Sequence, residues 1–324
     1  MSAPFSARDE SESRTLAATG PALVLVGGTA RSGSTVADLM LGSASYGFSC
    51  GEVFAWFRPF RPHHLDPICR CRDSNCPVWA QLRRTRANRF HSDAAEHLGA
   101  RLIVDSSKNL AWMSDSIRWA RRSGMPSKVL LVWKEPYDLA FSFFKRDSVD
   151  EAIHTAVRQF LDYYSMALSM ALSMDVPTVA VQNQLLRSKP AETVSDMCGA
   201  LGVPYEPGQE EFWRFEHHNL FGSDSASVQV RSASSLDDPA VSANFTERWQ
   251  SLGYDDSVAL TKVRAELLRH DVSQAAPRGT PSAIEPRYTR YQYGRQRLGG
   301  LARTARLVPA APVATIKRSL PSRG

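Results

Sequence analysis

Short apolar runs alternate along the chain with longer segments in which apolar residues recur every three or four positions. The short runs are rich in Val, Leu and Ile, which is typical of strands buried on both faces. Strands are therefore expected at 23–26, within 45–53, and at 101–105, 128–133 and 177–181.

The longer segments have helical periodicity. The clearest lies at 150–173, where Ile153, Val157, Phe160 and Tyr164 fall on one face. Helices are expected at 36–41, 111–122, 137–146, 150–173, 190–201, 209–216, 240–251 and 255–269, with another starting near Cys76-Pro77. Strands that alternate with helices predict an α/β fold of three layers, α/β/α, with a central parallel sheet whose carboxyl edge binds ligands.

Both ends of the chain differ in composition from the body. Residues 1–20 are polar and rich in Ser and Ala, and we expect them to be disordered. From Ala275 onward Pro, Gly and Arg dominate, and this tail holds ten Lys or Arg residues against one acid, Glu285. The expected organisation is one domain at 21–274, followed by an extended or disordered basic tail at 275–324.

Composition limits the classes of protein that fit. The net charge is +6, but the tail alone carries +9, so the body is close to −3 and a basic nucleic-acid-binding body is disfavoured. No stretch approaches the ~20 apolar residues of a membrane span. The start is not signal-like and five cysteines are too few for a disulfide scaffold, so we expect a cytoplasmic protein. The tail either contacts anionic membranes peripherally or is a solvated extension.

The strand at 23–26 leads into a loop of small residues and then into a helix. This order is typical of phosphate-binding loops, because backbone N–H groups at the helix N-terminus face the anion. Gly28, Gly33, Ser34 and Thr35 match the spacing of a nucleotide-triphosphate P-loop, except that Ser34 occupies the position of its Lys. Hydrolysis of nucleoside triphosphates is therefore disfavoured, and Arg31 is the cation of this P-loop-like segment.

Two further polar segments directly follow predicted strands. Residues 105–109 supply Lys108, and residues 134–142 supply Lys134 and Ser142. Because the carboxyl ends of parallel strands meet at one edge, all three segments are expected to lie together. Their separate cations and hydroxyls suit a ligand with several separate anionic groups.

The loop at 31–35 resembles the 5′-phosphosulfate-binding loop of sulfotransferases that use 3′-phosphoadenosine 5′-phosphosulfate (PAPS). Lys134-Glu135-Pro136, with Ser142 eight residues after Lys134, is similar to their 3′-phosphate motif, in which Arg-Asp-Pro is usual. Further matches, to bacterial members acting on carbohydrate or small-molecule hydroxyls, are Gly51-Glu52, the segment from Cys69 to Trp79, the run Asp105 to Lys108, and Glu247-Arg248-Trp249. The resemblance covers residues 20–272.

This resemblance implies transfer of a sulfuryl group from PAPS to a hydroxyl, with adenosine 3′,5′-bisphosphate (PAP) as product. The acceptor would be a carbohydrate, a glycolipid or a small metabolite. The 5′-phosphate would be held by Arg31, Ser32, Gly33, Ser34 and Thr35, and the 3′-phosphate by Lys134 and Ser142. Arg31 and Lys108 would stabilise charge on the bridging oxygen, and no metal ion is expected.

The acceptor hydroxyl needs a base. Cytosolic aryl and steroid sulfotransferases use a histidine just after the strand that corresponds to 101–105, but no His occurs between Arg101 and Ser148. Tyrosylprotein sulfotransferases instead use a Glu beyond the loop arginine, and Glu52, twenty-one residues after Arg31, matches that pattern. A salt-bridged or helix-capping Glu52 and a solvated Lys108 are the alternatives.

Several other residues leave alternatives open. Arg231 either reaches the 3′-phosphate or is solvated, and Asp105 is expected to orient its loop or cap the next helix. His64 with Cys69, Cys71 and Cys76 lacks a standard zinc spacing, so packing or a disulfide is favoured over a metal.

The remaining interpretations concern two histidines, a set of aromatic residues and the alternative function. His217 and His218 are expected to be exposed loop histidines, and Trp112, Trp119, Tyr163 and Tyr164 to be core residues. The alternative function is that of a nucleotide-binding protein similar to P-loop kinases or NTPases.

Overall fold

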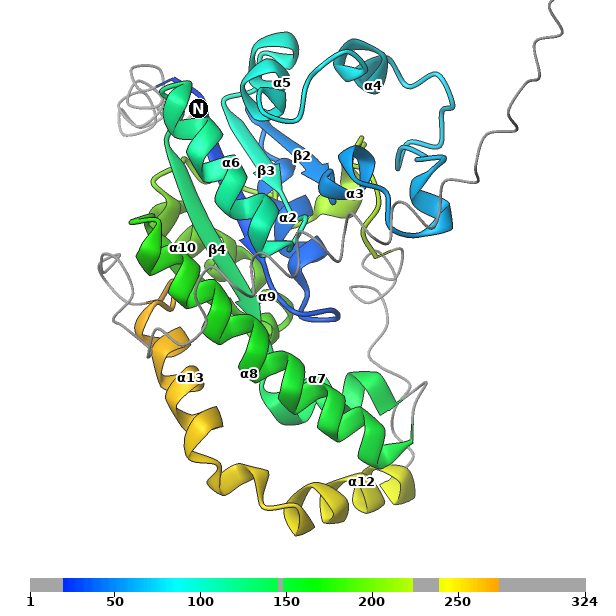
Figure 1. The fold of residues 1–324 in the computed structure, drawn as a ribbon, viewed down its shortest axis with the longest axis vertical. Helices are drawn as coiled ribbons and strands as arrows, with labels where there is room; N and C mark the ends of the chain where they lie inside the picture. Colours follow the sequence, from blue (N-terminus) through cyan, green and yellow to red (C-terminus); the bar gives the residue numbers. More distant parts are fainter. Residues whose placement is uncertain (1–19, 145–147, 224–238, 274–324) are drawn as a thin grey trace, which may run out of the picture.

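A computed structural model describes residues 20–144, 148–223 and 239–273. One sheet of five parallel strands runs through it, in the order β2-β3-β1-β4-β5 (Figure 1). The strands are β1 Ala22–Gly27, β2 Gly47–Gly51, β3 Leu102–Asp105, β4 Ser127–Trp133 and β5 Thr178–Gln182. All five are predicted by the sequence. The expected tails at 1–20 and 275–324 lie outside the described residues, apart from Gly20.

Side chains of the central strands alternate between two separate apolar cores. In β1, Leu23 and Leu25 belong to one core, whereas Val24 and Val26 belong to the other. In β4 the same period of two sends Leu131 to the first core and Val132 to the second. Both faces of the sheet are therefore covered, which confirms the predicted α/β/α layering.

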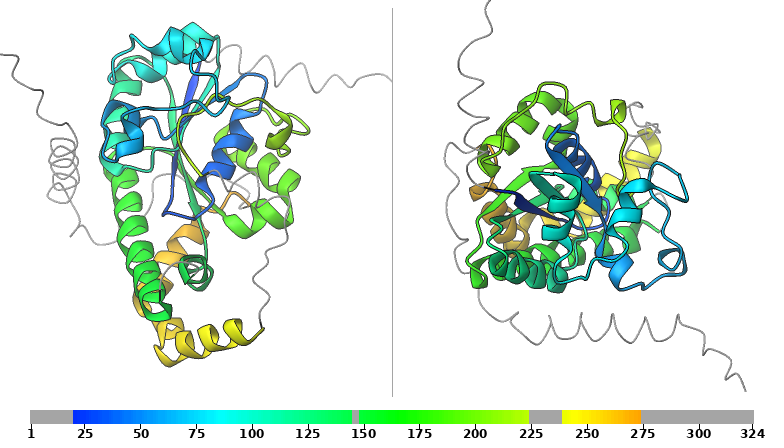
Figure 2. Two further views of the ribbon diagram at one scale, coloured as in Figure 1. Left: turned by 90° about the vertical axis from the view of Figure 1, so that its right-hand side faces the viewer. Right: turned by 90° about the horizontal axis from the view of Figure 1, so that it is seen from above.

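The helices divide between the two faces. Figure 2 shows α2 Ser34–Gly42 and α10 Pro190–Leu201 on one side of the sheet, and α6 Leu110–Arg122 and α8 Val149–Ser173 on the other. The remaining α-helices are α3 Phe54–Phe57, α4 Pro77–Leu82, α5 Phe90–Leu98, α7 Pro136–Phe144, α9 Asn183–Ser188, α12 Pro239–Ser251 and α13 Val258–Arg269. Short 3₁₀ turns occur at Pro62–His64, Phe212–Arg214 and Tyr254–Asp256.

Two kinds of difference separate this fold from the sequence-based expectation. The helices α3, α5 and α9 are not predicted. The expected helix at 209–216 is wrong, since only the 3₁₀ turn Phe212–Arg214 forms there. Gln209 explains part of this, because it is buried and its Nε2 donates to the carbonyl of Met40 at 3.2 Å. A polar side chain is therefore buried at a position where an amphipathic helix would bury an apolar one.

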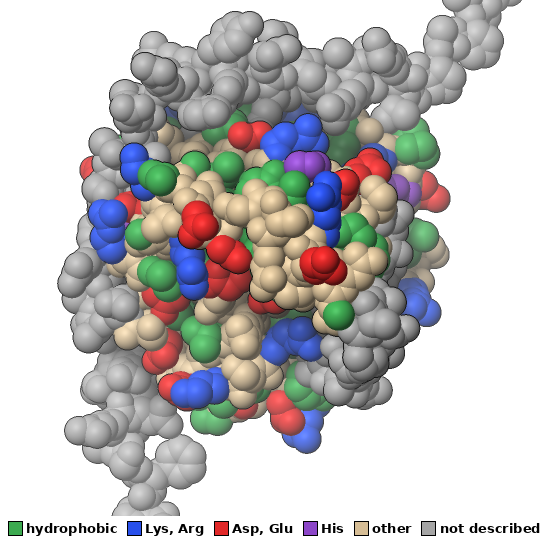
Figure 3. All heavy atoms as spheres, turned by 90° about the horizontal axis from the view of Figure 1, so that it is seen from below, with side chains coloured by type: hydrophobic (Ala, Val, Ile, Leu, Met, Phe, Trp, Pro, Cys, Tyr) green, Lys and Arg blue, Asp and Glu red, His purple; other side chains and the backbone are tan. Residues whose placement is uncertain are grey.

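The surface and the helices of the described residues fit a compact α/β protein. Acidic and basic side chains are interspersed on the face seen in Figure 3. No helix in the described ranges is both long and apolar enough to cross a membrane, α8 with its 25 residues included.

Candidate active site

A cleft of about 1260 Å³ opens at the carboxyl ends of the strands. The segments that follow β1, β2, β3 and β4 all line it, as expected for the ligand edge of a parallel sheet. The cleft therefore brings together the three segments singled out in the sequence, at 28–35, 105–109 and 134–142. Glu52, which follows β2, lies with them.

The loop of residues 28–33 joins β1 to α2. Gly33 is its last residue and has φ of 97°, a left-handed conformation that favours glycine. A Cβ atom there would also collide with the amide of Asn183, at the start of α9. Gly33, Ser34 and Thr35 line the cleft, so the first turn of α2 presents its unpaired backbone N–H groups to that space.

Two tyrosines of α8 fix the shape of the loop. Gly28 N–H donates to Tyr163 Oη at 3.0 Å, and Tyr163 in turn donates to the carbonyl of Lys108 at 3.0 Å. Tyr164 donates to the carbonyl of Val132 at 2.7 Å and accepts from Thr29 N–H at 3.4 Å. Tyr163 and Tyr164 are thus more than core residues, because their hydroxyls join the loops after β1 and β3 to each other and to strand β4. A single sequence carries no signal for this role.

Ser32 does not lie where we expected it. Its side chain is fully buried, and it is not among the residues that line the cleft, whereas its neighbours Arg31 and Gly33 are. Its side chain lies close to Gly28, on the inner side of the loop. Ser34 and Thr35 line the cleft, whereas the hydroxyl oxygen of Thr29 is buried.

The segment after β3 is held by a buried carboxylate. Asp105 Oδ2 accepts from Trp112 Nε1 at 2.7 Å and lies 2.8 Å from His91 Nε2, while Asp105 Oδ1 accepts the Ser107 N–H at 2.9 Å. The Ser107 hydroxyl, which also donates to Asp105, accepts the N–H of Phe54 at 2.9 Å. Asp105 therefore orients its loop, as expected.

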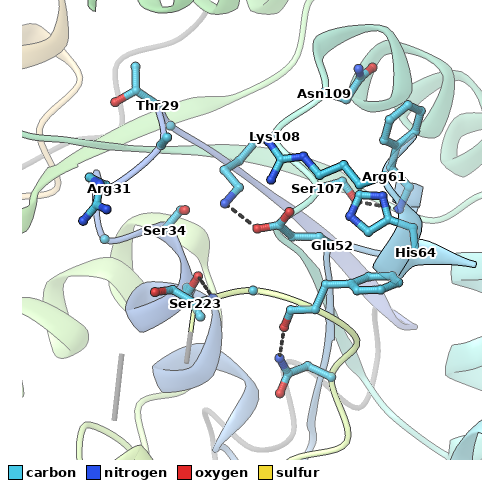
Figure 4. A pocket seen from close by; sticks show the side chains of 18 of the residues that line it. Thr29, Arg31, Ser34, Glu52, Arg61, His64, Ser107, Lys108, Asn109 and Ser223 are labelled. Carbon is cyan, nitrogen blue, oxygen red and sulfur yellow. Dashed lines mark hydrogen bonds and ion pairs between the residues drawn. The ribbon is translucent and has the colours of Figure 1, made fainter. Parts of the chain in front are cut away.

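Lys108 projects from this loop onto Glu52. Its Nζ donates to Glu52 Oε1 at 2.6 Å, and both side chains are partly buried. In Figure 4 Arg31 and Ser34 lie on one side of this ion pair, and Arg61 and His64 lie on the other. Glu52 is thus salt-bridged, which was one of the alternatives expected for it, whereas Lys108 lines the cleft and is not the solvated surface residue of its alternative.

His64 forms part of the far wall. Burial lowers its pKa to about 4, with smaller contributions from His63 and Arg61, so its imidazole is neutral at pH 7. Its Nδ1 accepts the N–H of Phe60 at 3.4 Å, and its ring packs edge-on against Phe221 with centroids 4.9 Å apart. With Nδ1 accepting, the proton resides on Nε2, so His64 presents no free basic nitrogen to the cleft.

Lys134 and Ser142 line the other end of the cleft. The hydroxyl of Ser142 donates to the carbonyl of Leu139 at 2.6 Å, so toward a ligand it has only its acceptor capacity and a shared proton. Burial raises the pKa of Glu135, whose carboxylate pairs with Arg264 at 2.9 Å. Arg231 lies outside the described residues.

Backbone strain gathers around the cleft. Five non-glycine residues of the described ranges have positive φ, and four of them line this cleft: Arg31 at 65°, Arg72 at 62°, Lys108 at 59° and Phe221 at 57°. Such conformations cost about 1–3 kcal/mol each and persist where the surrounding structure fixes them, most often at functional sites.

A second buried carboxylate stands behind the site and is not suggested by the sequence. Asp38 of α2 is completely buried, and the hydroxyl of Ser106 donates to its Oδ2 at 2.8 Å. Burial raises the pKa of Asp38 to about 7. It ties α2 to the segment that carries Lys108.

The histidines and cysteines group differently from the expectation. His64, which stands near the cysteines in the sequence, packs on Phe60 and Phe221. His217 is buried, with Nε2 at 2.7 Å from the carbonyl of Phe212, so its expected exposure is wrong. His218 lies with Cys76, the Nδ1 atom being 3.3 Å from Sγ.

Comparison with solved structures supports the fold. The chain is similar to the sulfotransferase domain from the curacin biosynthetic pathway, with a TM-score of 0.50 and 17% sequence identity over 76% of this chain and 98% of that one. A second similar chain is the sulfotransferase domain from the Synechococcus PCC 7002 olefin synthase, with a TM-score of 0.38, 14% identity, and coverage of 72% and 95%. No protein-family model and no curated protein matches the sequence. The first likeness shows that the chain has the sulfotransferase fold.

Proposed function

We propose that this protein transfers a sulfuryl group from PAPS to a hydroxyl group of a carbohydrate, a glycolipid or a small metabolite. The observation that carries the proposal is the Lys108–Glu52 ion pair, 2.6 Å long, between a phosphate-binding loop and a separate wall of the same cleft. The likeness in fold to the curacin-pathway sulfotransferase domain adds to it. A donor on one side and an acceptor on the other would both reach this pair.

The donor side of the cleft consists of the segments 28–35, 105–109 and 134–142. Backbone N–H groups of Gly33, Ser34 and Thr35 would bind the 5′-phosphate, because they belong to the first turn of α2. Lys134 and Ser142 would bind the 3′-phosphate at the other end, with Arg231 as a further candidate. Two separated anion sites match PAPS, which carries a phosphosulfate at the 5′ position of its ribose and a phosphate at the 3′ position.

The acceptor side of the cleft consists of residues 52–72 and 217–223. Phe60, His64 and Phe221 give it an aromatic surface, and Arg61 and Asp66 supply polar contacts. Arg158, Gln159 and Asp162 of α8 line the cleft as well. This mixture of aromatic and polar side chains is suited to a sugar or a similar polar metabolite.

Glu52 is the proposed base. Its carboxylate would take the proton of the acceptor hydroxyl as the oxygen forms a bond to sulfur and the bond from sulfur to the bridging oxygen breaks. Lys108 and Arg31 would stabilise the negative charge that develops on that bridging oxygen. The electron pair leaves with PAP, the proton stays on Glu52, and no metal ion is required by this scheme.

The kinase or NTPase alternative has less support. Ser34 stands where a P-loop has the Lys that holds the β- and γ-phosphates, and the ammonium group at the centre of this cleft comes from a different strand end.

Calorimetric titration of the full-length protein in magnesium-free buffer separates the two functions. The proposal predicts binding of PAP without magnesium and with higher affinity than Mg-ATP. A clear preference for Mg-ATP would favour the NTPase alternative instead. An acceptor can then be sought by incubating labelled PAPS with extracted metabolites, glycans and lipids, followed by mass spectrometry.

We further propose that the basic tail directs the enzyme, acting in the cytoplasm, to anionic membrane surfaces. The proposal rests on the ten Lys or Arg residues against one Glu after Ala275. Co-sedimentation with anionic vesicles should be stronger for the full chain than for residues 1–277. Equal binding of both proteins would contradict it.

A further inference from the structure

Four side chains with metal-binding atoms converge on the acceptor side of the cleft. They are Cys69, Cys71, Cys76 and His218, whose Sγ and Nδ1 atoms all lie within 4.8 Å of one another. The Sγ atoms of Cys69 and Cys71 are 3.2 Å apart, and His218 Nδ1 lies 3.3 Å from Cys76 Sγ and 3.8 Å from Cys69 Sγ. The three cysteines are free thiols.

These distances fit the coordination sphere of zinc. Tetrahedral sites have Zn–S bonds of about 2.3 Å and Zn–N bonds of about 2.0–2.1 Å, which puts neighbouring ligand atoms about 3.5–3.8 Å apart. The corresponding separations here are 3.2, 3.3 and 3.8 Å, and all four ligand atoms lie within 4.8 Å of one another, so small shifts of the side chains would bring them to these distances. Three sulfurs and one imidazole nitrogen are also the donor set that selects zinc over magnesium or calcium.

We propose that Cys69, Cys71, Cys76 and His218 bind one structural zinc ion. With four protein ligands the site has no open position for a substrate or a water molecule, so its role is structural rather than catalytic. Burial is consistent with this, because Cys69 and Cys76 are only 5% and 4% exposed. The ion would join two segments separated by about 140 residues, as the spacing of Cys76 and His218 shows.

The position of the site explains why such a bond is useful. Leu220, two residues after His218, pairs with Cys69 on one side and with Gly51 on the other. The carbonyl of Leu220 accepts the N–H of Glu52 at 2.9 Å, and its own N–H donates to Cys50 at 3.1 Å. The zinc would therefore hold the segment 218–220 against the backbone of the proposed base.

Two more contacts extend the same support. Arg70 N–H donates to the carbonyl of Asn219 at 3.1 Å, and the indole N–H of Trp79 donates to the carbonyl of His218. Gly51 has φ of 68°, and a Cβ there would collide with the carbonyl of Leu220. Segments without their own sheet or helix need such links, because loops carry few buried apolar contacts.

Metal content of the purified full-length protein tests the proposal directly. We expect inductively coupled plasma mass spectrometry to find about one zinc ion per chain. Cys76→Ser and His218→Ala should each lose most of that zinc. The matched controls are Cys198→Ser, a buried free cysteine outside the cluster, and His97→Ala, an exposed histidine; both should retain it. Protein grown with cobalt should show the visible absorption of tetrahedral Co²⁺ with thiolate ligands.

A second measurement on the unaltered protein covers the case in which the variants fail to fold. Cys69, Cys71 and Cys76 should resist alkylation until a chelator is added, and become reactive afterwards. Zinc-free protein after purification without chelators, equal zinc in Cys76→Ser and Cys198→Ser, or a native disulfide among the three cysteines would each overturn the proposal. None of these readouts depends on PAPS, so they stand or fall separately from the proposed activity.

Discussion

The proposed donor and acceptor sides of the cleft are built in different ways. The donor side consists of loops that leave β1, β3 and β4, so the hydrogen-bonded sheet sets the position of each loop. The acceptor side consists of residues 52–72 and 217–223, which contain one short α-helix, one 3₁₀ turn and isolated bridges. Its shape depends on aromatic packing and on links such as the proposed zinc site. The donor side is thus fixed by the fold, whereas the acceptor side is free to differ in shape on the same sheet.

Loss of the ion pair should have the largest effect, because Lys108 serves both sides. We expect Lys108→Ala to slow sulfuryl transfer by about 10²–10³-fold, the usual value of one preorganised donor at a developing negative charge. The matched control is Lys189→Ala, which breaks an exposed Lys–Glu pair at 3.2 Å outside the cleft. Equal losses of rate in both variants would contradict a role of Lys108 in the reaction.

The two residues proposed for the 3′-phosphate should differ in importance. Lys134→Ala should weaken PAP binding by about tenfold or more, because a hydrogen bond to a charged group contributes about 1.5–3 kcal/mol. Ser142→Ala should weaken it less, since the Ser142 hydroxyl already donates to Leu139. Calorimetry with PAP measures both. Unchanged affinity in Lys134→Ala would show that the 3′-phosphate lies elsewhere.

The tyrosine link on the donor side should have a smaller effect. Tyr163→Phe removes the hydroxyl that joins Gly28 to Lys108, so PAP affinity should fall by a factor of about three to ten, the value of one or two neutral hydrogen bonds. The control is Tyr46→Phe, whose hydroxyl donates to the carbonyl of Pro204 away from the cleft. Tyr46→Phe should lower stability without lowering PAP affinity, and the reverse pattern would argue against this role of Tyr163.

The smallest effect concerns stability and pH. Burial raises the pKa of Asp38 from 3.8 to about 7, with Asp105 raising it further and Lys108 lowering it. The folded state therefore holds a proton that the unfolded state releases, and the resulting stability is lost as pH rises from about 4 to about 7.

Asp38→Asn removes this proton equilibrium at nearly constant volume. The melting temperature of the variant, relative to the unaltered protein, should rise with pH across that window and level off above it. A difference that does not change with pH would show that Asp38 does not titrate there. Variants on the proposed acceptor side keep Asp38. The difference in melting temperature between them and the unaltered protein should therefore not show this rise with pH.

The sequence predicted which loops meet at the carboxyl edge of the sheet, but not how the segments 52–72 and 217–223 lie beside them, and the reason is physical. Strands such as β1 have a local apolar pattern, and the residue that follows a parallel strand must lie at the ligand edge, so Arg31, Lys108 and Lys134 could be placed from sequence alone. The contact between Cys76 and His218 could not be predicted from sequence alone, because the path of a loop brings His218 to Cys76.

The failures on the donor side have the same origin. Ser32 points inward and Tyr163 points toward the loop because of how α8 packs against the sheet, and periodicity does not encode that contact. Glu52 lay within reach of sequence reasoning only through its resemblance to a family, whereas its pairing with Lys108 comes from the structure.

The most direct test is the transfer of labelled sulfuryl groups from PAPS to an acceptor-containing cell extract by the unaltered protein and by Glu52→Gln. This substitution keeps the size of the side chain and removes the carboxylate. We expect transfer by the unaltered protein. With Glu52→Gln the rate should fall by about 10²-fold or more, the usual value of a general base, while both proteins bind PAP equally. Equal transfer rates would show that Glu52 is not the base and that the two sides of the cleft do not meet at this carboxylate.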